Sequence, residues 1–138
     1  MMKLLSGLMC TVFFLTEFLI SSVSTAQSTT LRLKIGYTIA ARLVAEGVNQ
    51  GTTVRNLDYQ EHLNHPFFEF YGITEVSSFG YFAVNPWTGD VWALWGCRRL
   101  STPALRKSQA AIRRRFSPAE LRQYPRLHRL KPECIVED

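Results

Sequence analysis

Residues 79–95, FGYFAVNPWTGDVWALW, decide the fold of this chain. Runs rich in aromatic and β-branched residues stand on both sides of NPWTGD, and this composition favours strands. Inside the break, Pro86 fixes φ and Gly89 is able to adopt a positive φ, as a tight turn requires. The stretch therefore predicts an antiparallel hairpin with strands at 79–84 and 91–95.

The alternation of side chains along the two strands predicts the two faces of the hairpin. One face would carry Phe82, Val84, Trp92 and Leu94. The other would carry Phe79, Tyr81, Ala83, Val91 and Trp95. Because both sets are apolar, we expect one face to pack on a helix and the other to meet the C-terminal segment or a partner.

The segments before the hairpin supply a helix and further strands. Apolar residues recur at helical spacing in residues 31–48, which predicts an amphipathic helix. This stripe comprises Ile35, Ile39 and Leu43, beside Val44 and Val48. The composition of residues 67–76 (FFEFYGITEV) favours a strand, and we expect a short strand at 52–57 and a polar loop at 58–66.

The C-terminal third is predicted to be helical. Residues 101–103 (STP) supply a helix cap followed by proline, so a helix is expected over 104–116. Residues 117–120 (SPAE) form a capping box that opens a short second helix. Pro125 and Pro132 then predict an extended tail.

The N-terminus, residues 1–26, has the layout of a secretory signal peptide. A short positive start precedes an apolar run at 4–20, and small residues lead to a cleavage site near Ala26. We therefore expect a periplasmic or secreted protein. A retained membrane anchor is the alternative, although Glu17 inside the apolar run disfavours it, and lipoprotein processing at Cys10 is a third reading.

Cleavage leaves residues 27–138 with two cysteines, Cys97 and Cys134. In an oxidising compartment such a pair predicts one disulfide, with two reduced buried thiols as the alternative. The sequence thus predicts a single α+β domain: a helix and a three- to four-stranded antiparallel meander at 27–96, and a basic helical extension at 97–138 closed by the disulfide.

Positive charge is concentrated in the extension. Residues 97–138 contain eleven Lys and Arg against four Asp and Glu, whereas residues 27–96 contain four against six. Secretion argues against nucleic acid as the partner, so an acidic protein or an anionic envelope surface is expected. We predict that Arg106, Arg113 and Arg114 contact that partner, and the alternative is a solvated helix face.

The turn itself is a second candidate contact. Trp87 stands beside proline at the tip of NPWTGD, flanked by Asn85 and Asp90, and tryptophan and arginine are enriched at binding hot spots. We predict that Trp87, Asn85 and Asp90 contact the partner. In the alternative reading, Trp87 folds back over the hairpin as a lid.

Enzyme chemistry has little support in the sequence. No nucleophile motif, phosphate-binding glycine loop or metal-ligand spacing occurs, so we expect no catalytic residue, no cofactor and no metal. His62 and His65, near acidic residues, allow one weak hypothesis, an envelope hydrolase. A solvated polar loop is the favoured explanation of both histidines.

Residues 84–91, VNPWTGDV, resemble the hairpin signature of PepSY-type domains. In that family a strand ends in an acidic or amide residue, followed by proline and a T-G-[DE]-V turn into the next strand. With the preceding helix and meander, the resemblance covers roughly residues 31–95. It implies an α+β domain of the cell envelope that acts by binding, in some members as a peptidase inhibitor.

These observations favour a non-enzymatic binding protein, secreted or periplasmic. Its most concrete form is an inhibitor or immunity-type protein acting on an envelope hydrolase or a toxin. The alternative is an accessory envelope protein that lies on anionic surfaces through its basic C-terminal helices. Salt separates the two, because adhesion through exposed charges weakens at moderate ionic strength.

Overall fold

The computed structural model describes residues 31–48, 52–60 and 66–135. The predicted signal peptide, residues 1–26, and the histidines His62 and His65 lie outside the described residues. The elements are α1 (Tyr37–Val48), the 3₁₀ turn η1 (Val54–Asn56), β1 (Leu57–Gln60), β2 (Phe68–Ile73), β3 (Ser78–Val84), β4 (Val91–Ala93), β5 (Arg98–Arg99), α2 (Pro103–Arg113), α3 (Pro118–Leu121) and α4 (Tyr124–His128).

The strands form one antiparallel meander in the order β1-β2-β3-β4-β5, so the predicted α+β fold is confirmed. The sheet has five strands rather than the three or four expected. The additional pairing comes from β1, which extends into the predicted loop at 58–66, and from β5, whose two residues are too few to give a strand pattern. The predicted strand at 52–57 is replaced by η1 and the first residue of β1.

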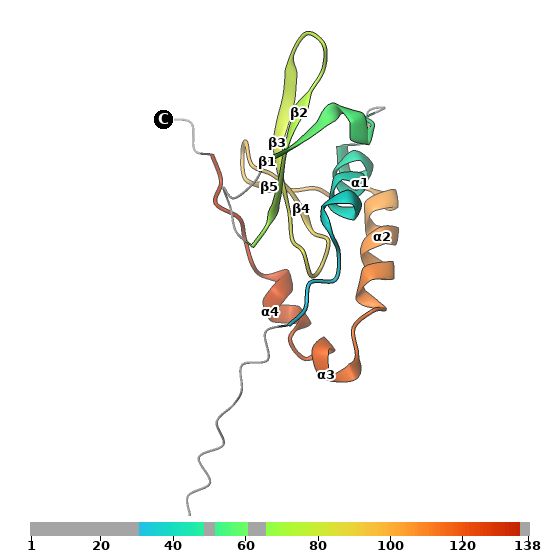
Figure 1. The fold of residues 1–138 in the computed structure, drawn as a ribbon. Coiled ribbons are helices and arrows are strands. Elements are labelled where there is room, and N and C mark those ends of the chain that lie inside the picture. Colours follow the sequence, from blue (N-terminus) through green and yellow to red (C-terminus); the bar gives the residue numbers. More distant parts are fainter. Residues whose placement is uncertain (1–30, 49–51, 61–65, 136–138) are drawn as a thin grey trace, which may run out of the picture.

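The helix α1 lies against one face of the sheet, and α2 packs beside α1 (Figure 1). Leu43 and Val44 of α1 belong to the same core cluster as Leu105 of α2, and all three side chains are fully buried. The sheet contributes Phe70, Phe82, Val84 and Val91 to the same cluster. Burial of large apolar side chains, at roughly 1.5–3 kcal/mol each, therefore stabilises this layer.

The pairing of β3 with β4 corrects the predicted faces of the hairpin. Val84 pairs with Val91, and Ala83 pairs with Trp92. Because directly opposed residues share a face, Val84 and Val91 face the helices, whereas Trp92 and Ala83 lie on the opposite face. The prediction that Val84 and Trp92 share a face is wrong. All six residues of NPWTGD lie between the paired Val84 and Val91, so the register differs by one residue from the predicted one, and a shift of one residue exchanges the two faces.

The helix predicted to end at residue 116 ends at Arg113, and two larger differences have a physical cause. The first helix begins at Tyr37 rather than at residue 31, because the backbone N–H groups of Lys34 and Ile35 donate to Pro86 O at 3.0 and 3.2 Å. The second difference is α4, where the sequence predicted an extended tail. Pro125 stands in the first turn of this helix, where its missing N–H costs nothing.

The predicted helix caps are present. The Thr102 side chain accepts from Leu105 N at the start of α2, with Pro103 next in the chain. Ser117 and Glu120 form the predicted capping box of α3. These local signals therefore position both helices as the sequence indicated.

The disulfide Cys97–Cys134 is present and spans a sequence separation of 37. It holds the C-terminal segment against the end of the sheet, where Ile135 N donates to Leu94 O at 3.2 Å. A disulfide indicates an oxidising compartment outside the cytoplasm. Within the part of the chain that the structure describes, no helix has the length and apolar character needed to cross a bilayer.

Candidate functional site

The NPWTGD turn is closed onto the C-terminal helices. The Asn85 side chain is fully buried, and its Nδ2 donates to Leu127 O at 2.8 Å. Its Oδ1 accepts from the backbone N–H groups of Trp87 and Thr88 at 3.0 and 3.1 Å. Asn85 thus fixes the turn and joins it to α4.

Asp90 makes a second buried connection to α4. Its Oδ2 accepts from Thr88 Oγ1 at 2.6 Å and lies 2.8 Å from His128 Nδ1. Arg99 Nη1 lies 2.9 Å from His128 Nε2, and Arg99 Nη2 donates to His128 O at 2.7 Å. Asn85, Thr88, Asp90, Arg99 and His128 are called the turn cluster below.

The partners of His128 in the turn cluster indicate which of its ring nitrogens donates and which accepts. An arginine guanidinium only donates, so Nε2 accepts from Arg99 and Nδ1 carries the proton given to Asp90. Nε2, the ring nitrogen that would accept a proton in general-base catalysis, therefore already accepts the hydrogen bond from Arg99. Tyr124 stacks on the imidazole with a ring-centroid distance of 5.9 Å, and burial followed by the Asp90 charge raises the pKa of Tyr124.

Three predicted contact residues therefore occupy internal positions. The contact of Asn85 and Asp90 with a partner stays a prediction, and in this structure both side chains are buried and hydrogen-bonded within the chain. Trp87 does not project from the turn. It is half-buried against the core, and its Nε1 donates to Leu31 O at 2.9 Å, as in the lid reading.

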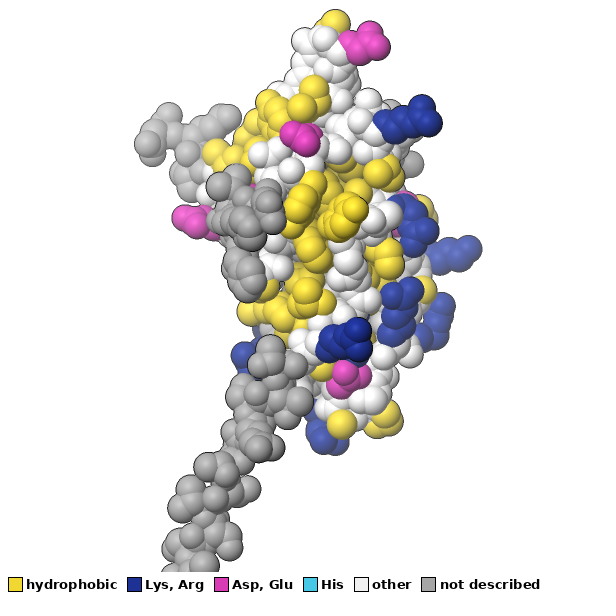
Figure 2. All heavy atoms as spheres, viewed as in Figure 1, with side chains coloured by type: hydrophobic (Ala, Val, Ile, Leu, Met, Phe, Trp, Pro, Cys, Tyr) yellow, Lys and Arg dark blue, Asp and Glu magenta, His cyan; other side chains and the backbone are white. Residues whose placement is uncertain are grey.

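The other three predicted contact residues are exposed on α2. Arg106, Arg113 and Arg114 recur on one side of the helix, with Ala110 between them, and are called the basic α2 face. Within the described residues no carboxylate forms an ion pair with them, since Glu120 pairs with Lys34 and Asp90 with His128. Figure 2 shows Lys and Arg side chains gathered along the edge where α2 lies in Figure 1.

The basic α2 face borders an apolar hollow of about 420 Å³. Arg113 and Arg114 flank it, and its remaining lining is apolar: Ala110, Phe116 and Leu121. Leu121 is 38% exposed, so the hollow offers an apolar side chain to a partner. Arg115 turns away and donates to Lys34 O at 3.2 Å, as expected if three consecutive arginines cannot serve one contact.

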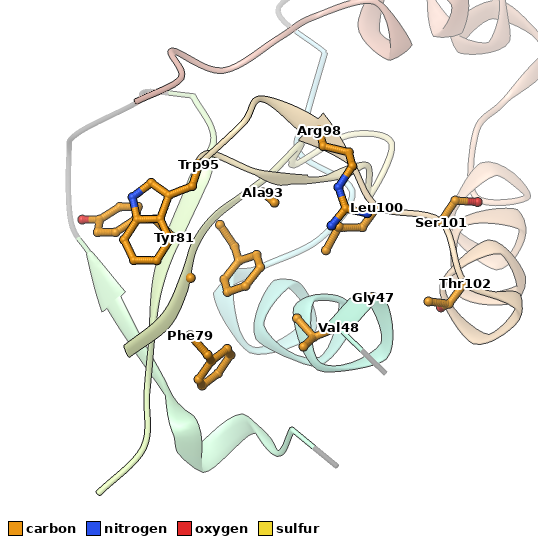
Figure 3. A pocket seen from close by; sticks show the side chains of 12 residues that line it. Gly47, Val48, Phe79, Tyr81, Ala93, Trp95, Arg98, Leu100, Ser101 and Thr102 are labelled. Carbon is orange, nitrogen blue, oxygen red and sulfur yellow. The ribbon is translucent and has the colours of Figure 1, made fainter. Parts of the chain in front are cut away.

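A second hollow, which the sequence did not reveal, opens between α1, the sheet and the segment that enters α2. This groove has a volume of about 450 Å³ (Figure 3). Its side chains include Val48, Phe79, Phe82, Trp95, Arg98 and Leu100. They come from four separate segments, so no local motif marks the groove, and the exposed Trp95 and Arg98 are its only sequence signals.

The residues described by the structure hold no group of three or more His, Cys, Asp or Glu arranged for a metal ion. Comparisons of the chain with protein-family models, curated proteins and solved structures gave no match. The described residues thus offer three candidate sites: the closed turn cluster, the basic α2 face with its hollow, and the groove.

Proposed function

We propose that this chain is a non-enzymatic binding protein, secreted or periplasmic, that holds an acidic protein partner on its basic α2 face. Its most concrete form is an inhibitor or immunity-type protein for an envelope hydrolase or a toxin. The observation that carries the proposal is the exposure of Arg106, Arg113 and Arg114 without a carboxylate partner among the described residues.

Charge and shape both support an acidic protein as the occupant. Unpaired arginines attract carboxylates by steering and by bidentate hydrogen bonds. The hollow beside Arg113 and Arg114 accepts an apolar side chain, which gives the contact a desolvated centre. Arg113 is also held in place, with its guanidinium 4.9 Å from the Tyr124 ring centroid, so less side-chain freedom is lost on binding.

The setting agrees with this proposal. The disulfide suits a protein that works outside the cytoplasm. The signal-peptide pattern of residues 1–26 and the resemblance of residues 84–91 to PepSY-type domains stay predictions, and both point to an envelope binding role. The resemblance and the proposed contact surface fall on different parts of the chain, so each can fail without the other.

The test is a pull-down from envelope and secreted fractions with the oxidised protein as the cell exports it. A variant with Arg106→Gln, Arg113→Gln and Arg114→Gln is compared with Arg55→Gln, which removes an exposed arginine on η1. We expect one stoichiometric partner, retained by Arg55→Gln and lost by the triple variant. Equal retention by both variants would contradict the proposal.

Salt separates this proposal from the accessory alternative, in which the basic helices adhere to anionic surfaces. A partner held through the apolar hollow stays bound at high ionic strength, because apolar burial does not weaken with charge screening. Broad binding that disappears at moderate salt would favour surface adhesion.

A further inference from the structure

The groove between α1, β3, β4 and the segment entering α2 has the size of a small-molecule site. Its volume of about 450 Å³ lies inside the roughly 300–1,000 Å³ typical of ligand pockets. It is separate from the hollow on the basic α2 face, and the two share no lining residue.

The inner wall of the groove is built from aromatic rings laid close to the backbone. Phe79 and Phe82 lie with ring centroids 6.0 Å apart. Each lies over a glycine: a Cβ at Gly72 would come within 2.5 Å of the Phe79 ring, and one at Gly80 within 2.4 Å of the Phe82 ring. Because these glycines pair across β2 and β3, the sheet itself makes room for an apolar wall.

Two of the polar side chains at the rim already form hydrogen bonds within the chain. Thr102 Oγ1 donates to Glu46 O at 2.7 Å and accepts from Leu105 N. Ser101 Oγ accepts from Arg106 Nη1 at 3.0 Å and keeps its own hydrogen and a second lone pair. Tyr81 and Trp95 also line the groove, so its neutral hydrogen-bonding groups include the Tyr81 hydroxyl and the Trp95 indole N–H.

Arg98 is the charged residue among those that line the groove. It is exposed, and its guanidinium forms no hydrogen bond or ion pair with the rest of the described residues, while its backbone pairs with Ala93 of β4. Figure 3 shows it reaching from β5 to the side of Leu100, opposite Trp95. A free guanidinium presents a planar set of donors that matches a carboxylate.

The geometry points to a site for a small organic acid: a single carboxylate held by Arg98, with an aliphatic or aromatic body against Phe79, Phe82 and Val48. One cation matches one negative charge, so a monoanion fits better than a phosphate dianion. The apolar wall adds affinity in proportion to the area that it removes from water.

The probe is octanoate, and its neutral control is octanamide, which has the same chain length. Calorimetric titration of the oxidised protein is expected to give saturable 1:1 binding of octanoate, with octanamide at least about tenfold weaker, since a charge-assisted hydrogen bond is lost. Arg98→Gln should remove this preference and leave octanamide binding unchanged. Arg113→Gln, on the basic α2 face, should leave both titrations unchanged.

A spectroscopic readout keeps the test valid if a variant folds poorly. In the wild-type protein, octanoate should shift the indole N–H resonance of Trp95 and leave that of Trp87, which donates to Leu31 O, in place. Absence of saturable binding, equal affinity for octanoate and octanamide, or an unchanged preference in Arg98→Gln would overturn the proposal. None of these results bears on the basic α2 face, which is tested separately by the pull-down of a protein partner with the arginine variant.

Discussion

The turn cluster and the basic α2 face are both rich in polar groups, yet they use them in opposite ways. In the turn cluster, Asn85 and Asp90 are buried and bonded to α4 and to the turn itself. On the basic α2 face, Arg113 and Arg114 are exposed and have no carboxylate among the described residues. Groups already satisfied inside the chain hold the fold, and groups left unsatisfied at its surface are the ones available to a partner.

The largest expected effect on stability comes from removing the disulfide that holds the C-terminal segment. The turn cluster depends on this segment because α4 lies in it. Replacing Cys97 and Cys134 by serine frees a loop with a sequence separation of 37. In the chain-entropy model this lowers the free energy of unfolding by about 4 kcal/mol. Urea denaturation of the oxidised protein and the double variant measures the change. The reduced wild-type protein should match the variant, and a loss below about 1 kcal/mol would contradict the expectation.

The next change breaks the turn cluster directly. Asn85→Ala removes the donor to Leu127 O and the acceptor for Trp87 N and Thr88 N. Because these groups are then left buried without partners, we expect a loss of about 3 kcal/mol in the free energy of unfolding. The control is Asn56→Ala, whose side chain bonds only to the exposed Thr53 and should cost well under half as much.

A matched pair of glycine substitutions tests the wall of the groove. Gly80→Ala places a Cβ against the Phe82 ring, so the ring must move, and overpacking of this kind costs about 2 kcal/mol. Gly36→Ala meets no atom within 4 Å and should leave stability nearly unchanged. Equal melting temperatures for the two variants would show that the Phe82 ring adapts freely.

The smallest effect is a pH dependence at the contact between α3 and Lys34. The hydrogen bond from Lys34 Nζ, followed by that from Ser117 N, holds the pKa of Glu120 below its ordinary value of 4.5. A lowered pKa in the folded state contributes stability above about pH 4.5, and this contribution is lost as the pH falls through the lowered value. Glu120→Gln should therefore destabilise the protein at pH 7 but not at pH 2. A difference in melting temperature that persists at pH 2 would argue against this ion pair.

Much of the fold follows from local sequence signals. The hairpin at 79–95, the caps at Thr102 and Ser117, and the pairing of Cys97 with Cys134 are all present. The hairpin and the caps depend on residues that are adjacent in the chain. The disulfide could be predicted because Cys97 and Cys134 are the two cysteines in the predicted mature residues 27–138. The strand β5 was beyond such reasoning, because its two residues carry no alternating pattern and pair only through the sheet.

The candidate sites were predicted less well, for a physical reason. Asn85, Asp90 and Trp87 have the composition of an exposed turn. The burial of Asn85 and Asp90 depends on α4, some 40 residues further along the chain, and Trp87 is bonded to Leu31, 56 residues before it. Arg106, Arg113 and Arg114 were chosen because positive charge is concentrated in this segment, and the helix turns Leu105 and Ile112 inward and leaves these arginines exposed. Sequence therefore indicates which face of a helix is exposed, but not which turn a distant helix will cover.

The most direct test measures stability and partner retention together for Asn85→Ala and for the variant with Arg106→Gln, Arg113→Gln and Arg114→Gln. The account predicts that Asn85→Ala loses about 3 kcal/mol of stability and, where folded, keeps the partner at high salt. The arginine variant should stay within about 0.5 kcal/mol of the wild-type protein and lose the partner. Retention of the partner by the arginine variant, with loss by folded Asn85→Ala, would contradict the account and place the contact at the turn.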